Sequence, residues 1–176
     1  LSLKGFLREV HITEIGYFNI PSFFAAIERV LDPSLSSKAI AIAPPQSDRA
    51  KIWAVSSEAR KSGIVKGIPV AVAKRMDRNL IILPPQPDIY NRANRKLFEH
   101  FKQSFPLFEM EREGKFYFDY EGMKTLYGDI QDFSNRFQDQ VSFDLRLDSS
   151  IGLAANKLVS KTAAKFISAE KEILFI

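Results

Sequence analysis

The chain alternates between short apolar runs that favour β-strands and segments whose apolar residues recur at helical spacing. The first such pair constrains the fold most: residues 12–20 read as a strand, and Phe23, Ile27, Val30 and Leu31 follow as one helix face. Pro21 is acceptable in the first turn of that helix. The first N–H groups of a helix are unpaired and attract anions or metal-bound phosphates, so residues 19–22 are a candidate site.

The rest of the chain continues the alternation. The long amphipathic helix at about residues 88–104 ends before Pro106, which disfavours helical geometry at Phe105. Further helices are expected over 56–63, 67–76, around 130–141 and over 156–167, strands over 38–43, 51–56, 80–85 and 149–154, and a hairpin of 107–113 and 115–121 around Gly114. This order predicts an α+β fold with a small lobe inserted in a sheet lobe at about 23–84.

Composition excludes several classes of site. The 176 residues include no cysteine, so disulfides and thiolate metal sites are excluded, and the two histidines are too few for a His-rich metal site. No apolar run reaches the roughly 18 residues that a membrane span needs, and the N-terminus lacks a signal-peptide pattern. We therefore expect no membrane association and a cytoplasmic location.

Positive charge is concentrated in one segment. Residues 49–78 hold eight basic and two acidic side chains, a net charge of +6, whereas the whole chain carries +4. Such a segment suits a polyanion. A solvated face on a small lobe explains the same cluster equally well.

Four stretches, in register and correctly spaced, resemble Y-family (translesion, DinB/UmuC-like) DNA polymerases. They are "FFAAIERVLDPSLSSKAIAI", "AVSSEARKSGIVKGIPVAVAKRM", "IYNRANRKLFEHFKQSFPLFE" and "SSIGLAANKLVSKTAAK". The resemblance implies a ferredoxin-like palm over 1–22 and 85–176 and a fingers lobe over 23–84. The thumb and the C-terminal DNA-binding domain of the family would lie beyond Ile176 and are absent from this chain.

The resemblance breaks at the metal ligands. Family polymerases hold two Mg²⁺ ions with an aspartate at the strand-helix junction and an Asp-Glu pair in the palm hairpin. The matching positions here are Asn19, with Pro21 two residues later, and Gly114-Lys115. Clustered carboxylates are what hold two hard divalent ions a few ångströms apart, and a lysine opposes their entry.

Other acids offer only weak alternatives as ligands. Glu113 neighbours Gly114, and Asp119 and Glu121 lie on the next expected strand. Metal coordination needs converging geometry as well as a count of acids, so the sequence does not favour a rebuilt two-metal site.

Nucleotide contacts are partly retained on the fingers side. Arg60 matches the arginine that grips the triphosphate, but its usual tyrosine partner is replaced by Ser57. Phe24 matches the aromatic steric gate against ribose, although a plain core phenylalanine is an equally good interpretation. Ser22 replaces another aromatic residue near the phosphates.

The last expected helix carries a stripe of lysines. Lys157 and Lys161 match lysines of the palm, and Lys165 shares their helix face at i, i+4, i+8. The stripe either faces a DNA backbone or lies in solvent. A further family lysine that reaches the triphosphate falls near Ser168 and is missing.

The resemblance therefore points to the inactive, ImuB-like branch of the family, such as the polymerase-like subunit of the bacterial mutasome. It implies a DNA-repair role in translesion synthesis and the SOS response, with weak non-specific DNA binding. A sliding clamp and other polymerase subunits would be partners through regions outside this chain. No cofactor is expected. The alternatives are an active nucleotidyltransferase with an unorthodox Mg²⁺ site and a protein scaffold that touches no DNA.

Overall fold

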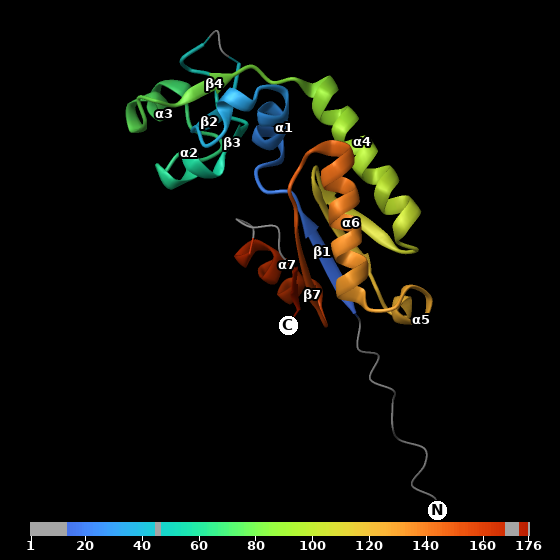
Figure 1. The fold of residues 1–176 in the computed structure, drawn as a ribbon. Coiled ribbons are helices and arrows are strands. Elements are labelled where there is room, and N and C mark those ends of the chain that lie inside the picture. Colours follow the sequence, from blue (N-terminus) through green and yellow to red (C-terminus); the bar gives the residue numbers. More distant parts are fainter. Residues whose placement is uncertain (1–13, 45–46, 168–172, 176) are drawn as a thin grey trace, which may run out of the picture.

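The computed structural model describes residues 14–44, 47–167 and 173–175, and its main body is built on a five-stranded sheet (Figure 1). The sheet contains β1 (Ile15–Asn19), β5 (Phe108–Arg112), β6 (Lys115–Asp119), β7 (Ser150–Ala154) and β8 (Ile173–Phe175), in the order β5-β6-β1-β7-β8. β1 runs antiparallel to both β6 and β7. The first four strands and their intervening helices follow the ferredoxin-like order, which confirms the predicted α+β class.

Helices cover both faces of this sheet. α4 (Pro87–Ser104) and α6 (Ile130–Leu145) lie on one face, and α7 (Lys157–Phe166) packs on β7 and β1 from the other (Figure 1). Phe116 and Phe118 of β6 point into the core between the sheet and α4 and α6, as the two-residue period of a strand requires. No described helix combines the length and the apolar character needed to cross a membrane.

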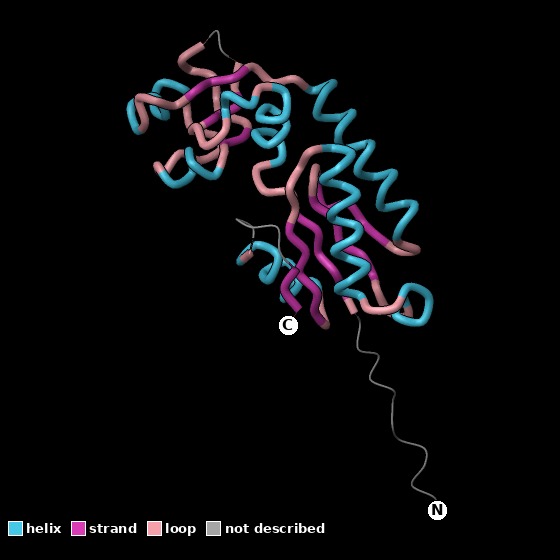
Figure 2. Tube along the Cα trace, viewed as in Figure 1, coloured by secondary structure: helices cyan, strands magenta, loops and turns pink. Residues whose placement is uncertain are grey.

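The second sheet is small and lies at one end of the molecule (Figure 2). It contains β3 (Ala54–Val55), β2 (Ile40–Ile42) and β4 (Ile81–Leu83), in that order, and it carries α2 (Ser57–Lys61) and α3 (Val70–Met76). Their apolar side chains form a separate core cluster, which makes this part a lobe with its own interior.

The helix α1 (Phe23–Leu31) joins the two parts. Phe23 and Ile27 belong to the large core of the five-stranded sheet. Ala25, on the other side of the helix, is buried with Ile40 and Ile42 of the small sheet. Because one face of α1 packs into the main core and another packs on the small sheet, in a cluster distinct from the lobe's own interior, α1 holds the lobe against the main body.

Several elements differ from the sequence expectation. The strand expected over 51–56 is reduced to β3, because Lys51 instead forms an isolated bridge with Pro69. A 3₁₀ helix (Pro33–Leu35), α5 (Met123–Tyr127) and β8 were not predicted. β8 is held by pairing with β7, which periodicity cannot reveal in three residues. The expected start of β1 at residue 12 lies outside the described residues.

Candidate functional site

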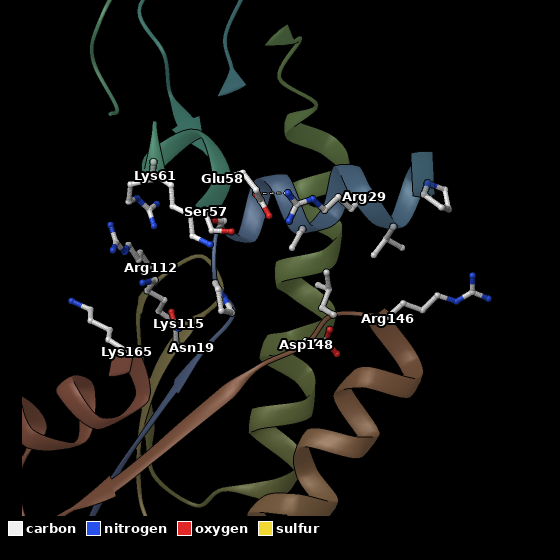
Figure 3. Close-up of a pocket in the computed structure, with 17 residues that line it drawn as sticks. Asn19, Arg29, Ser57, Glu58, Lys61, Arg112, Lys115, Arg146, Asp148 and Lys165 are labelled. Atoms are coloured by element: carbon white, nitrogen blue, oxygen red, sulfur yellow. Dashed lines mark hydrogen bonds and ion pairs between the residues drawn. The ribbon is translucent and has the colours of Figure 1, made fainter. Parts of the chain in front are cut away.

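A cleft of about 1110 Å³ opens between the small lobe and the end of the main sheet (Figure 3). Its walls are the end of β1, one face of α1, the helix α2, the β5–β6 hairpin, the connection between α6 and β7, and the C-terminal end of α7. Seven of its lining side chains are basic, and only Glu58 and Asp148 are acidic. The cleft is therefore an electropositive hollow located at the predicted strand-helix junction.

Asn19 is the last residue of β1 and lies directly opposite Lys115 on β6 and Ser150 on β7. Its side chain is only 2% exposed. Nδ2 donates a hydrogen bond of 3.3 Å to Oγ of Ser150, and Oδ1 has no hydrogen-bond partner. A buried amide oxygen without a partner is costly, so this end of β1 is incomplete without a further donor.

The turn after Asn19 also leaves a polar atom without a partner. Ser22 sits at the N-cap of α1 in the left-handed region, with φ 49°, and its side chain makes no capping hydrogen bond. Its Oγ is buried and unpaired, and the residue lines the cleft. The first turn of α1 therefore has no side-chain cap on the side that faces the cleft.

Gly114 occupies a turn position that excludes a side chain. Its φ is 71°, and a Cβ added there would lie 2.6 Å from Cδ2 and 2.9 Å from Cγ of Phe23. Its carbonyl accepts from the N–H of Ile20 at 2.8 Å, and its own N–H donates to Oδ1 of Asn94 at 3.1 Å. The hairpin is thus hydrogen-bonded to the junction, with no room for a side chain at residue 114.

Lys115 brings positive charge into the cleft. It is the direct cross-strand partner of Arg112 on β5, and Figure 3 shows both on the same side of the cleft as Lys165. Burial, together with the charges of Arg112 and Lys165, lowers the pKa of Lys115 from its ordinary value of 10.5 to about 8. Like charges placed opposite each other across a hairpin destabilise it.

The two-metal site implied by the resemblance does not fit these residues. A neutral amide, a proline, a glycine and an ammonium stand at the four positions: Asn19, Pro21, Gly114 and Lys115. Within the described ranges, no group of three or more histidine, aspartate or glutamate side chains is placed to hold a metal ion. The cation of Lys115 opposes divalent ions in the same volume.

The alternative acidic ligands do not converge on the cleft. Asp119 ends β6 opposite Ile15, four residues from Lys115, which is about 14 Å along a strand. Its Oδ1 accepts from the N–H of Glu121 at 2.8 Å, so both acids lie at the far end of the strand. Glu113 is exposed in the hairpin turn and is absent from the cleft lining.

The helix α2 supplies the small-lobe side of the cleft. Arg60 and Lys61 line it, as does Ser57, where the resemblance implies a tyrosine. Glu58 is paired with Arg29 of α1 at 2.5 Å. Burial alone would raise the pKa of Glu58, but the hydrogen bond and charge of Arg29 outweigh this and lower it. The acid of α2 is thus already neutralised.

The lysine stripe of α7 divides between two environments. Lys157 forms an ion pair with Glu109 and lies 5.1 Å from the ring centroid of Tyr117. Lys161 pairs with Glu111, whose hydrogen bond raises the pKa of this lysine. Only Lys165 lines the cleft, whereas the two lysines singled out from the sequence are neutralised by β5.

Two other sequence candidates are placed as follows. Phe24 packs its ring on Tyr90 and Phe23, with centroids 4.9 and 5.6 Å apart, and it is not part of the cleft lining. This placement favours the core interpretation over the steric gate. Ser168 lies outside the described residues.

Sequence reasoning missed Arg112, which lines the cleft beside Lys115. A signal for it was present, because a two-residue turn at Glu113-Gly114 places residues 112 and 115 opposite each other. Arg146 was also missed. It lines the cleft because it ends α6 with φ 55° in the left-handed region, which no sequence pattern specified.

Comparison with known proteins identifies the family of the chain. Residues 18–165 match the model of the impB/mucB/samB family. The chain is 35% identical over 153 residues to DNA polymerase IV 1 of Halalkalibacterium halodurans, covering 85% of this chain and 36% of that protein. It is 33% identical over 152 residues to DNA polymerase IV 1 of Bacillus subtilis (strain 168), with the same coverage.

Solved structures show the same fold. The crystal structure of DinB from Sulfolobus solfataricus has a TM-score of 0.82 at 19% identity, covering 93% of this chain and 48% of that one. The insertion ternary complex of Dbh DNA polymerase has a TM-score of 0.80 at 19% identity, with the same coverage.

The chain therefore belongs to the impB/mucB/samB family of Y-family DNA polymerase domains. It spans about a third of the length of the curated relatives and about half of the solved polymerases.

Proposed function

We propose that the chain is a non-catalytic polymerase-like module of DNA repair, which binds DNA or a protein partner with the retained polymerase shape. The single observation that supports this is the pairing of Asn19 with Lys115 across β1 and β6. An amide and an ammonium stand where a polymerase needs converging carboxylates, and no described acid replaces them.

We propose the division that the resemblance implies, with a palm over 1–22 and 85–176 and fingers over 23–84. Weak, sequence-independent DNA binding through the basic cleft suits a translesion-repair protein of the cytoplasm. We also propose that a sliding clamp and a separate active polymerase bind regions outside this chain.

Primer extension tests the proposal. The full-length protein, purified from a host lacking its own translesion polymerases, is incubated with primed template, dNTPs and Mg²⁺ or Mn²⁺. No extension is expected, while DNA polymerase IV 1 of Bacillus subtilis serves as the active control. Template-dependent extension that is lost on Glu113→Gln or Asp119→Asn would establish the active nucleotidyltransferase instead.

A further inference from the structure

We propose that the cleft binds a polyphosphate chain free of divalent metal, with Lys115 and Arg112 supplying the positive charge that metal ions supply in a polymerase. This inference rests on the proposed loss of catalysis. It specifies that the ligand is a polyanion without bound metal, and it predicts that Mg²⁺ weakens the binding of this polyanion.

The first support is a cluster of three cations that have no directly bonded carboxylate in the described part of the chain. Arg112 and Lys115 face each other across the hairpin, and Lys165 approaches from α7 (Figure 3). Among the described residues, no carboxylate forms a hydrogen bond or ion pair with any of these three cations. A cluster of this kind is stabilised when an anion enters it.

The second support is that the neighbouring acids are engaged elsewhere. Glu111 precedes Arg112 on β5, yet its carboxylate binds Lys161 and accepts a 2.5 Å hydrogen bond from the hydroxyl of Tyr17. Glu109 is paired with Lys157. The acids of β5 thus neutralise the outer lysines of α7 and leave the cations at the cleft for a ligand.

The third support is the pair of unsatisfied polar groups at the junction. Oγ of Ser22 is buried without a partner at the N-cap of the nine-residue helix α1. Oδ1 of Asn19 is likewise unpaired in a side chain that lines the cleft. A phosphate oxygen can accept from the serine hydroxyl and the first N–H groups of α1, and a protonated phosphate or a ligand hydroxyl can donate to Asn19.

Binding should be linked to protonation. Lys115 is faced by Arg112 and Glu111 of β5, by Lys161 and Lys165 of α7 and by the amide of Asn19, and its pKa is lowered to about 8. A bound anion favours the ammonium form, so its entry raises this pKa. Affinity should therefore fall as pH rises through about 8, and binding at pH 8 should take up protons.

Calorimetry of the full-length protein tests the proposal. dATP and inorganic tripolyphosphate are titrated separately, each with EDTA and with excess Mg²⁺, at pH 7 and pH 9.5. We expect both ligands to bind in EDTA. Excess Mg²⁺ should lower their affinity severalfold, because it neutralises the phosphates. The affinity should also be lower at pH 9.5 than at pH 7. Equal affinity of both ligands would identify the phosphate chain alone as the determinant, and tighter dATP binding would identify a nucleotide.

Two variants locate the site. Lys115→Met should lower the affinity in EDTA about tenfold, the usual effect of losing one charged hydrogen bond. Lys157→Met is the matched control, because Lys157 is paired with Glu109 outside the cleft. This variant should bind the ligand with the same affinity as the wild type. Circular dichroism and thermal melting of both variants confirm that they are folded.

Three results would overturn the inference. The first is that neither ligand binds in EDTA, and the second is that Lys115→Met and the wild type bind with equal affinity. The third is that tight binding requires Mg²⁺. The first two, combined with absent primer extension, reject only the polyphosphate site. Mg²⁺-dependent binding together with primer extension rejects the proposed function as well.

Discussion

Gly114 stands in a turn that has no room for a side chain. Its positive φ and the ring of Phe23 both exclude one. The sequence alone predicts, through the resemblance of the hairpin, that a metal-binding carboxylate is missing here. It could not reveal that Phe23 fills the space, because that contact joins residues far apart in the chain.

The first prediction concerns this position. Gly114→Asp should lower the free energy of unfolding by about 1–3 kcal/mol, from backbone strain and from displacement of Phe23. Urea unfolding measures the loss. Gly122→Asp is the matched control, since Gly122 has a similar φ of 74° with no atom near the added Cβ. Equal losses in both variants would show that the contact with Phe23 costs nothing.

A second prediction concerns the charge state of Lys115. Its pKa is about 8 in the folded protein and 10.5 ordinarily, so the unfolded chain binds more protons between these values. This group therefore destabilises the fold below pH 8, and its penalty disappears as pH rises towards 10.5. Lys115→Met should be more stable than the wild type at pH 7 and should lose that advantage at pH 10.5.

Denaturant unfolding of both proteins at the two pH values, in buffer without phosphate, measures the difference. An advantage of the variant that stays constant with pH would contradict the assigned cause, since a packing gain does not titrate.

At the scale of elements, periodicity was enough for the long helices and the hairpin but not for the short pieces. α4 and α6 have apolar faces that repeat over several turns, so their positions could be read from the sequence. β8 and α5 contain three and five residues and depend on tertiary neighbours. The ion pairs between the lysines of α7 and the acids of β5 also depend on tertiary neighbours, so the sequence could not predict them.

The third prediction concerns the packing of α7. A Cβ added at Gly152 would lie 2.1 Å from the backbone oxygen of Ser160 and 2.6 Å from the nitrogen of Ala164. Because both atoms are backbone, α7 itself must move. Gly152→Ala should cost at least about 2 kcal/mol of stability, measured by urea unfolding. A loss below about 0.5 kcal/mol would show that the helix shifts freely on the sheet.

At the scale of the whole molecule, some basic side chains line the cleft and others are paired with acids outside it. The sequence indicated a basic segment over residues 49–78, and the structure adds cations from the main body to the same cleft. Arg60 and Lys61 face it from α2, and Lys115 and Lys165 face it from the main body. The sequence could not distinguish these cleft-lining cations from Lys157 and Lys161, which are paired with acids, because the distinction depends on neighbours from other strands.

The fourth prediction follows for DNA. Full-length protein carrying Arg60→Gln, Lys61→Gln and Lys165→Gln should bind all sequences more weakly, with a salt slope reduced by about 1 per lost phosphate contact. Lys157→Gln and Lys161→Gln together should change the affinity little. Fluorescence anisotropy with two unrelated duplexes over a salt series measures both. Salt-independent binding by the wild type would favour a scaffold that uses no phosphate contacts.

The packing of α1 on both parts of the molecule has a consequence for how the cleft responds to an occupant. Widening or narrowing the cleft would pull Phe23 and Ile27 from the main core or Ala25 from its contact with the small sheet. The walls are thus spaced before a ligand arrives, and little chain entropy is lost on association. Because little apolar surface changes exposure, the heat-capacity change of ligand binding should be small.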